Sequence, residues 1–205
     1  MIGKYIIEEL ANISVEYEQA SEFRYRHFVK QENSCYIFIS QSGETADTIE
    51  ALKLVKKHNI PSFGICNVIG SQISRLTDGG VYLHVGPEIG VASTKAFTGQ
   101  VLILYLIALN IAQSKKINQE LCDNVLDSLI KLPDIYKTIL DKCKDKLEYQ
   151  SKLYKYANNF LFLGRGYNYP IALEAALKLK EISYIHAEGY SASEMKHGPI
   201  ALIDK

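Results

Sequence analysis

The chain has 205 residues, of which 47% are hydrophobic, 22% are charged and 13 are glycine. This composition is typical of a globular protein and excludes disordered, collagen-like and low-complexity chains. Its 23 basic and 23 acidic residues cancel. Because proteins that bind nucleic acid usually carry a basic excess, we expect no nucleic-acid partner.

Membrane and metal binding are not expected either. The longest apolar run, Val101–Leu109 extended to Ala112, is shorter than the roughly 20 residues that cross a bilayer, so it predicts a buried helix. The four cysteines lie far apart, without the spacing of zinc ligands: Cys35, Cys66, Cys122 and Cys143. Cys35 and Cys66 stand in apolar runs and are predicted to be buried thiols, which favours a cytoplasmic location.

In the first half of the chain, short apolar strands are predicted to alternate with helices. The predicted strands cover residues 13–18, 35–39, 62–66 and 81–85. The predicted helices, with apolar residues at helical spacing, cover residues 2–10, 46–58 and 94–112. The run at 35–39 is continuously apolar, which predicts a strand buried on both faces. This alternation is typical of a doubly wound parallel sheet and places the chain in the α/β class.

The second half begins with a charged helical segment and ends by repeating the strand–loop–helix pattern. Regularly spaced leucines predict a helix from residue 119 to about 158, with a break at Pro133. A buried strand at 160–163 and a helix to about residue 184 follow, with Pro170 in the first turn of that helix. We therefore expect two related α/β units joined by a helical connector. Because neither unit has enough strands for a complete sheet, we expect an internal piece of a longer protein.

The polar loop Ser40-Gln-Ser-Gly-Glu-Thr45 is the most informative segment. It lies between a predicted buried strand and a helix, at the carboxyl edge of a parallel sheet, where ligands bind. Backbone N–H groups at the start of a helix, together with hydroxyl groups, form an anion site. We therefore predict that Ser40, Ser42 and Thr45 bind a phosphate group. The alternative is that these hydroxyl groups only cap the helix.

A charged stripe is predicted on the helix that ends near residue 184. Glu174, Lys178 and Glu181 share one face of this helix, whose other residues are mostly apolar. One interpretation is a pocket wall, where a glutamate moves a proton between sugar carbons while the lysine holds a developing negative charge. The other interpretation is a solvated ladder of ion pairs.

His197 lies in the polar turn Glu194-Met-Lys-His-Gly-Pro199, which suits ligand contact better than a core position does. An imidazole that titrates near neutral pH is able to pass a proton to a sugar ring oxygen. A purely structural role is the alternative. The remaining histidines lack such a context and are predicted to be structural or surface residues: His27, His58, His84 and His186.

Four motifs, in this order, resemble the isomerase half of the glutamine–fructose-6-phosphate aminotransferases, also called glucosamine-6-phosphate synthases. The first, Ser40–Thr48, is similar to the phosphosugar loop of sugar isomerase (SIS) domains. The other three narrow the resemblance to this family: Glu88–Thr98, Ala172–Glu188 and Lys196–Asp204. The resemblance implies a flavodoxin-like three-layer SIS domain over 1–117 that lacks its first strand, a helical connector over 118–158 and a partial second SIS domain over 159–205.

The resemblance also implies an activity and the residues that perform it. The family converts fructose 6-phosphate and glutamine to glucosamine 6-phosphate and glutamate, as a homodimer, without a metal or an organic cofactor. The residues that it assigns to phosphate and sugar binding are Ser40, Gln41, Ser42, Thr45, Val91 and Ser93. Glu181 would be the base that moves a proton between C1 and C2, Lys178 would assist, and His197 would open the sugar ring in the neighbouring subunit's pocket.

Three parts of the family pattern are expected to be missing. They are the glutaminase half, which opens with a cysteine where Ile2 stands here, the strand ending in Cys-Gly-Thr-Ser, and the C-terminal Schiff-base lysine. We therefore expect sugar-phosphate binding, no amino transfer from glutamine, little isomerisation and poor solubility from exposed sheet edges. The alternatives are an inactive phosphosugar-binding module and another SIS-type sugar phosphate isomerase.

Overall fold

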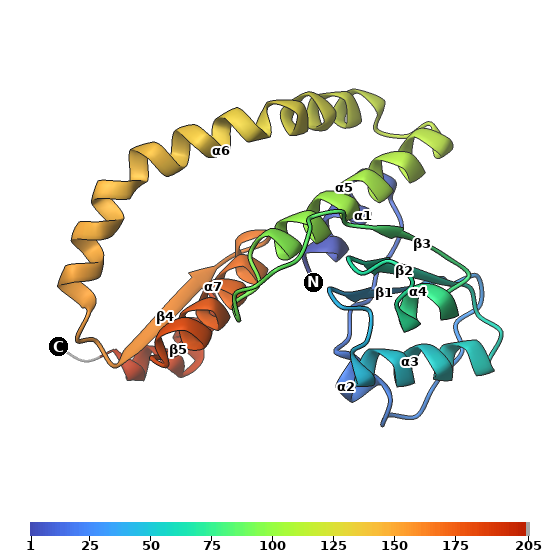
Figure 1. The fold of residues 1–205 in the computed structure, drawn as a ribbon, viewed down its shortest axis with the longest axis horizontal. Coiled ribbons are helices and arrows are strands. Elements are labelled where there is room, and N and C mark those ends of the chain that lie inside the picture. The colour runs from blue at the N-terminus through green and yellow to red at the C-terminus, as the bar shows by residue number, and fades with distance from the viewer. Residues whose placement is uncertain (204–205) are drawn as a thin grey trace. The chain divides into compact units, whose positions relative to one another are not determined.

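The computed structural model describes residues 1–203 and divides into two compact units. The mid-chain unit is Ser14–Ile107, and the terminal unit combines Met1–Ile13 with the chain from Ala108 onward. Each unit contains its own parallel sheet with helices packed on it (Figure 1). The predicted α/β class with parallel strands is confirmed.

The mid-chain unit is built on a three-stranded sheet in the order β1-β2-β3. Its strands are β1 (Tyr36–Ser40), β2 (Ser62–Cys66) and β3 (Gly79–Tyr82), and its helices are α2 (Ala20–Phe23), α3 (Ala46–Lys57), α4 (Gln72–Leu76) and the first part of α5 (Lys95–Lys115). Tyr36 lies opposite Ser62, and Phe63 lies opposite Gly79. Helices α3 and α4 lie on the same side of the sheet (Figure 1), and their apolar faces meet Phe38 and Cys66 in a buried core.

Strand β1 differs from the prediction in its burial. Phe38 faces α3 and is buried, but Ile37 is 36% exposed and Ile39 is 38% exposed. Since β1 lies at the edge of its sheet, only the face under α3 is fully covered. Cys35, just before the strand, is exposed, so the prediction of a buried thiol there is wrong. Cys66 ends the central strand and is buried, as predicted.

Two other predictions for this unit were inaccurate. Within the described chain, residues 13–18 form no strand, because their alternating pattern finds no neighbouring strand to pair with. Strand β3 begins at Gly79, two residues earlier than predicted. Gly80 permits this pairing, because a Cβ atom there would lie 2.5 Å from the carbonyl oxygen of Gly64 on β2.

Helix α5 is buried on one side only. Ala96 and Leu104 are buried, whereas Leu102 is 40% exposed and Leu106 is 42% exposed. The apolar run at residues 101–112, which by itself is too short to cross a membrane, lies within α5, and α5 has 21 residues. By length and composition alone it could cross a membrane, a criterion that the core helices of soluble proteins also meet.

The terminal unit contains a two-stranded parallel sheet. Its elements are α1 (Ile2–Ala11), the last part of α5, α6 (Gln119–Tyr154), β4 (Asn159–Gly164), α7 (Asn168–Ser183), β5 (His186–Ser191) and the 3-10 helices η1 (Glu194–His197) and η2 (Pro199–Leu202). Helix α7 connects the strands and packs on both. Gly189 allows this close packing, because a Cβ atom there would lie 2.7 Å from the Cα atom of Leu173.

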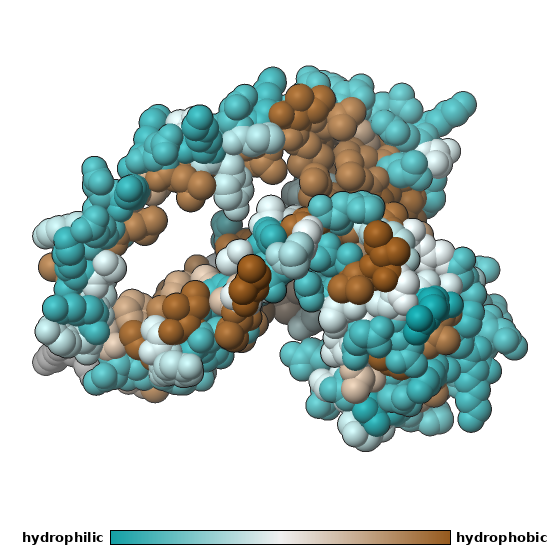
Figure 2. All heavy atoms as spheres, in the orientation of Figure 1, coloured by the Kyte–Doolittle hydropathy of each residue, from teal (hydrophilic) through white to brown (hydrophobic). Residues whose placement is uncertain are grey.

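Helix α6 runs without interruption past Pro133, so the predicted break is wrong. Proline removes one N–H donor and bends a helix, but helical turns on both sides can continue through it. Figure 1 shows α6 as a curved helix, and Figure 2 shows apolar side chains along it. Its start is tied to α1, because the side-chain amide of Asn118 donates to the carbonyl oxygens of Glu9 at 3.0 Å and Leu10 at 3.2 Å.

Candidate functional site

The loop Ser40–Thr45 leads from the end of β1 into α3, at the carboxyl edge of the sheet. Gly43 forms its turn with a φ of +67°, and a Cβ atom there would lie 2.0 Å from the Oγ atom of Ser71. The carbonyl oxygen of Gly43 accepts the N–H of Ile73 at 3.0 Å. The loop is therefore held against the start of α4, and only glycine fits at its turn.

The hydroxyl groups of this loop line the start of α3. The Oγ atom of buried Ser40 lies 2.9 Å from the Oγ1 atom of Thr45 and accepts the N–H of Gly43 at 3.0 Å. Ser42 Oγ accepts the N–H of Glu44 at 3.1 Å. Thr45 precedes α3, and in the part of the chain that the structure describes its side chain makes no capping hydrogen bond.

The first N–H groups of an α-helix have no partner within the helix and carry partial positive charge. At α3, Thr45 is the residue before the helix and makes no capping hydrogen bond among the described residues, and Ser42 accepts the N–H of Glu44, which precedes the helix. Within the described residues, the hydroxyl group of Thr45 therefore does not cap α3. The arrangement is suited to bind an anion such as a phosphate group.

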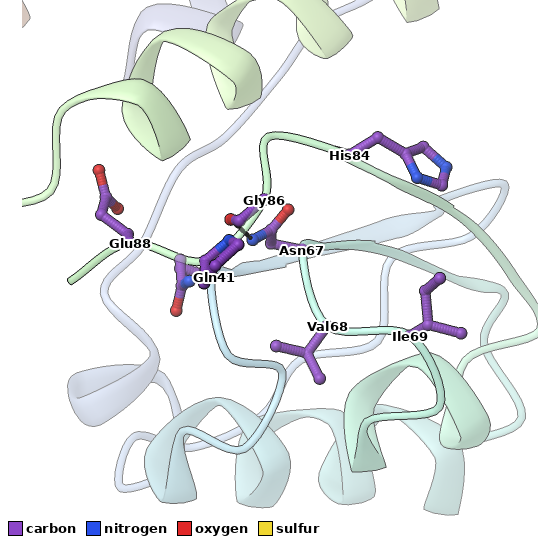
Figure 3. A pocket seen from close by; sticks show the side chains of 8 residues that line it. Gln41, Asn67, Val68, Ile69, His84, Gly86 and Glu88 are labelled. Carbon is purple, nitrogen blue, oxygen red and sulfur yellow. Dashed lines mark hydrogen bonds between the residues drawn. The ribbon is translucent and has the colours of Figure 1, made fainter.

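A cavity of about 570 Å³ opens beside the loop (Figure 3). Its lining comes from the segments that follow the three strands: Gln41, Asn67, Val68, Ile69, His84, Gly86, Pro87 and Glu88. Ligands of open parallel sheets bind at this edge of the fold. The sequence predicts Gln41 as a site residue, and the structure places it in this lining.

Asn67 and His84 were missed by the sequence analysis. Asn67 directly follows β2, as Gln41 directly follows β1, and this shared position is the signal that could have revealed it. The side-chain Nδ2 of Asn67 donates to the carbonyl oxygen of Gly86 at 2.8 Å, and its Oδ1 accepts the N–H of Val85 at 3.2 Å. Asn67 therefore connects two parts of the cavity wall.

The predicted residues Val91 and Ser93 lie between the cavity wall and the start of α5. A carboxylate oxygen of Glu88 accepts the N–H of Thr94 at 2.6 Å. This hydrogen bond, helped by the Ser93 hydroxyl group, holds the pKa of Glu88 below its usual value. Val91 is 90% exposed, so its side chain does not belong to the core.

The charged stripe of α7 forms ion pairs that are partly shielded from water. Lys178 Nζ lies 3.5 Å from a carboxylate oxygen of Glu174 and donates to a carboxylate oxygen of Glu181 at 2.5 Å. These three side chains are between 21% and 29% exposed. Burial lowers the pKa of Lys178, but the hydrogen bond to Glu181 and the charge of Glu174 outweigh it and raise that pKa.

The two groups of predicted residues belong to different units. Ser40, Gln41, Ser42, Thr45, Val91 and Ser93 lie in the mid-chain unit, and Lys178, Glu181 and His197 lie in the terminal unit. In the mid-chain unit, the hydroxyl groups of Ser40 and Thr45 lie within hydrogen-bond distance of each other. In the terminal unit, Lys178 donates a hydrogen bond to Glu181. His197 ends η1 and is exposed. Within residues 1–203, no group of three His, Cys, Asp or Glu side chains is placed to hold a metal ion.

Comparison with known proteins shows the family to which the chain is similar. The SIS domain family matches residues 1–110 and 153–205. The chain is 58% identical over 205 residues to the glutamine–fructose-6-phosphate aminotransferase (isomerizing) of Bacteroides thetaiotaomicron, and 56% identical to that of Chlorobaculum tepidum. Each match covers 100% of this chain and 33% of the relative, so the chain spans about a third of the length of these curated relatives.

A solved structure is similar over the whole chain. It is the C-terminal domain of glucosamine-fructose-6-phosphate aminotransferase from Francisella tularensis, with a TM-score of 0.96 and 45% sequence identity. The match covers 100% of this chain and 58% of that one. The fold and the order of its elements are therefore those of a known sugar-phosphate enzyme domain.

Proposed function

The chain belongs to the SIS domain family, and we propose that it is the sugar-phosphate-binding isomerase portion of a glutamine–fructose-6-phosphate aminotransferase. One observation carries the proposal: the hydroxyl-rich loop Ser40–Thr45 lies at the uncapped start of α3, beside a cavity. Hydroxyl groups and helix N–H groups bind a phosphate group without a fixed positive charge. A sugar phosphate therefore binds here through its phosphate group, with the sugar in the cavity.

The family's reaction gives the other residues their proposed roles. In the complete enzyme, fructose 6-phosphate and glutamine become glucosamine 6-phosphate and glutamate, which commits the product to amino-sugar synthesis. Glu181 removes a proton from C1 of the sugar and returns one to C2, and protonated Lys178 stabilises the negative charge that develops between these steps. His197 moves the proton that opens the sugar ring.

The setting proposed for this chemistry follows the family as well. The sugar phosphate is the small-molecule partner, and no metal or organic cofactor takes part. The complete enzyme is a homodimer in the cytoplasm, where His197 serves the neighbouring subunit's pocket.

Calorimetric titration with glucosamine 6-phosphate tests the proposal. Removing two hydroxyl groups with Ser42→Ala and Thr45→Val should weaken binding at least tenfold, since a hydrogen bond to a charged group contributes about 1.5–3 kcal/mol. The matched control is Ser128→Ala with Thr138→Val on α6, where each hydroxyl group donates to a carbonyl oxygen of its own helix. Equal affinity of the two double variants would refute the assignment of the loop.

An assay of fructose 6-phosphate isomerisation on the same samples separates an enzyme from a binding module. Turnover that is lost in Glu181→Gln supports the proposed base. Binding without turnover identifies an inactive phosphosugar-binding module.

A further inference from the structure

Two segments of the mid-chain unit flank the cavity, and Asn67 touches both. The first segment is the loop Ser40–Thr45 after β1, and the second is residues 85–94, which lead from β3 to α5. Figure 3 shows the side chain of Asn67 pointing toward Gly86, with a dashed line marking their hydrogen bond. The backbone N–H of Asn67 donates to the carbonyl oxygen of Gln41 at 3.0 Å, which holds the first segment.

The side chain of Asn67 holds the second segment by continuing the sheet beyond its last strand pair. Pairing of β2 with β3 ends where Cys66 lies opposite Tyr82. Past that point the amide group of Asn67 donates to Gly86 at 2.8 Å and accepts from Val85 at 3.2 Å. A primary amide that both donates to and accepts from a backbone replaces the peptide group of a neighbouring strand.

The second segment is held to Asn67 at its start and closed on itself toward its end. At its start the side chain of Asn67 donates to Gly86, which has a φ of +71°. Toward its end the carboxylate of Glu88 accepts the N–H of Thr94 at 2.6 Å, which closes the loop that carries Val91 and Ser93. Val91 is 90% exposed and has little packing of its own to hold it in place. The position of this loop relative to the phosphate-binding loop therefore depends on Asn67.

We propose that Asn67 is a positioning residue for the sugar: its side-chain amide sets residues 85–94 beside the loop Ser40–Thr45, so that a bound sugar phosphate meets Val91 and Ser93. The inference rests on the proposed function. Asn67 acts through Gly86 and Val85. The phosphate group itself contacts the loop Ser40–Thr45 and the start of α3, and Asn67 does not take part in those contacts. Its loss should therefore affect recognition of the sugar and spare recognition of the phosphate.

The test compares two ligands on one set of variants by calorimetry: glucosamine 6-phosphate and inorganic phosphate. Asn67→Ala should weaken binding of the sugar phosphate by about fivefold, the effect of about one net hydrogen bond, and leave phosphate binding within about twofold. Asn67→Gln keeps the amide group but displaces it by one methylene group, and should show the same selective loss. This second variant carries the test if Asn67→Ala does not fold.

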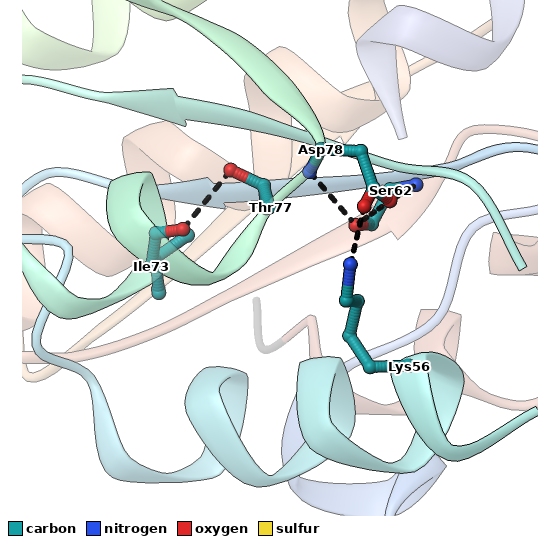
Figure 4. A network of polar contacts seen from close by, with 5 residues as sticks. All are labelled: Lys56, Ser62, Ile73, Thr77 and Asp78. Carbon is teal, nitrogen blue, oxygen red and sulfur yellow. Dashed lines mark hydrogen bonds and ion pairs between the residues drawn. The ribbon is translucent and has the colours of Figure 1, made fainter. Parts of the chain in front are cut away.

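The matched control is Asp78, which lies where strands β2 and β3 begin, at the opposite end of these strands from Asn67 (Figure 4). There Asp78, just before β3, accepts the N–H of Ser62 at 2.9 Å and the Ser62 hydroxyl group at 2.7 Å, so it also joins β2 to β3. Asp78→Ala should lower thermal stability and change neither affinity by more than about twofold, because it is remote from the ligand edge.

Three results would overturn the inference. The first is an equal loss of affinity for both ligands in Asn67→Ala, and the second is no loss of affinity for either ligand. The third is the same selective loss of affinity for glucosamine 6-phosphate in Asp78→Ala. If the wild-type chain binds neither ligand, the proposed function fails first, and the inference falls with it. If the wild type binds both ligands and only the selectivity of the Asn67 variants is absent, the proposed function stands and the inference alone is refuted.

Discussion

Substitution of Gly43 by alanine should disrupt the loop Ser40–Thr45 more than the small size of the added methyl group suggests. Gly43 has a φ of +67°, a conformation that costs an L-residue roughly 1–2 kcal/mol. The new Cβ atom would also lie 2.0 Å from Ser71 Oγ and 3.3 Å from Cys66 Sγ. Ser71 is 3% exposed and Cys66 is 1% exposed, so neither side chain has open space to move into.

Relief of this overlap by backbone shifts costs a further amount of about 1–3 kcal/mol. Gly43→Ala should therefore lower the free energy of unfolding by about 2–5 kcal/mol in total. Gly70→Ala provides the matched control, because Gly70 has a φ of +71° with no atom within 4 Å of the new Cβ position. Gly70→Ala should lower the free energy of unfolding only by the cost of the left-handed backbone conformation, about 1–2 kcal/mol.

The assay is urea unfolding of both variants, with the midpoint and slope compared with the wild type. Gly43→Ala should also weaken binding of glucosamine 6-phosphate, whereas Gly70→Ala should not. If Gly43→Ala is no less stable than Gly70→Ala, Ser71 does not confine the turn, and the reasoning about this loop is wrong.

Two further predictions concern the core and the pH dependence of the mid-chain unit. Leu52→Ala, in the fully buried face of α3, should lower the free energy of unfolding by about 2–5 kcal/mol, whereas Ile130→Ala, 70% exposed on α6, should change it by less than about 0.5 kcal/mol in the same urea experiment. Hydrogen bonds from Lys56 and Ser62 lower the pKa of Asp78 to about 2, so its stabilising effect is present above its unfolded pKa, near 3.8, and is lost as the pH falls through about 2. In thermal melts, the melting temperature should fall further between about pH 4 and about pH 2 in the wild type than in Asp78→Asn. Melting temperatures that fall in parallel with pH in the two proteins would contradict this role.

Elements whose signal is local were predicted well from the sequence. Strand β2 occupies Ser62–Cys66 as predicted, and α3 ends one residue before the predicted boundary. Both are short periodic segments between polar loops, so neighbouring residues define them. Strand β5 was missed, because His186-Ala-Glu-Gly has little intrinsic β propensity. Its pairing with β4, 27 residues earlier, decides its structure.

The candidate site divides in the same way. The hydroxyl groups of Ser40, Ser42 and Thr45 stand within six residues and are visible as one motif. Asn67 and His84 join the same cavity only because parallel strands bring their carboxyl ends to one edge. The exposure of Ile37 and Ile39 depends on the position of β1 at the edge of its sheet, which no local pattern reports.

The most direct measurement is a nitrogen–proton NMR titration of the whole chain with glucosamine 6-phosphate. If the loop at the start of α3 binds the phosphate group, the backbone N–H signals of Ser40–Thr45 and of the first turn of α3 should shift most. Inorganic phosphate should shift the same signals. A well-dispersed spectrum whose loop signals do not move with either ligand would contradict the account.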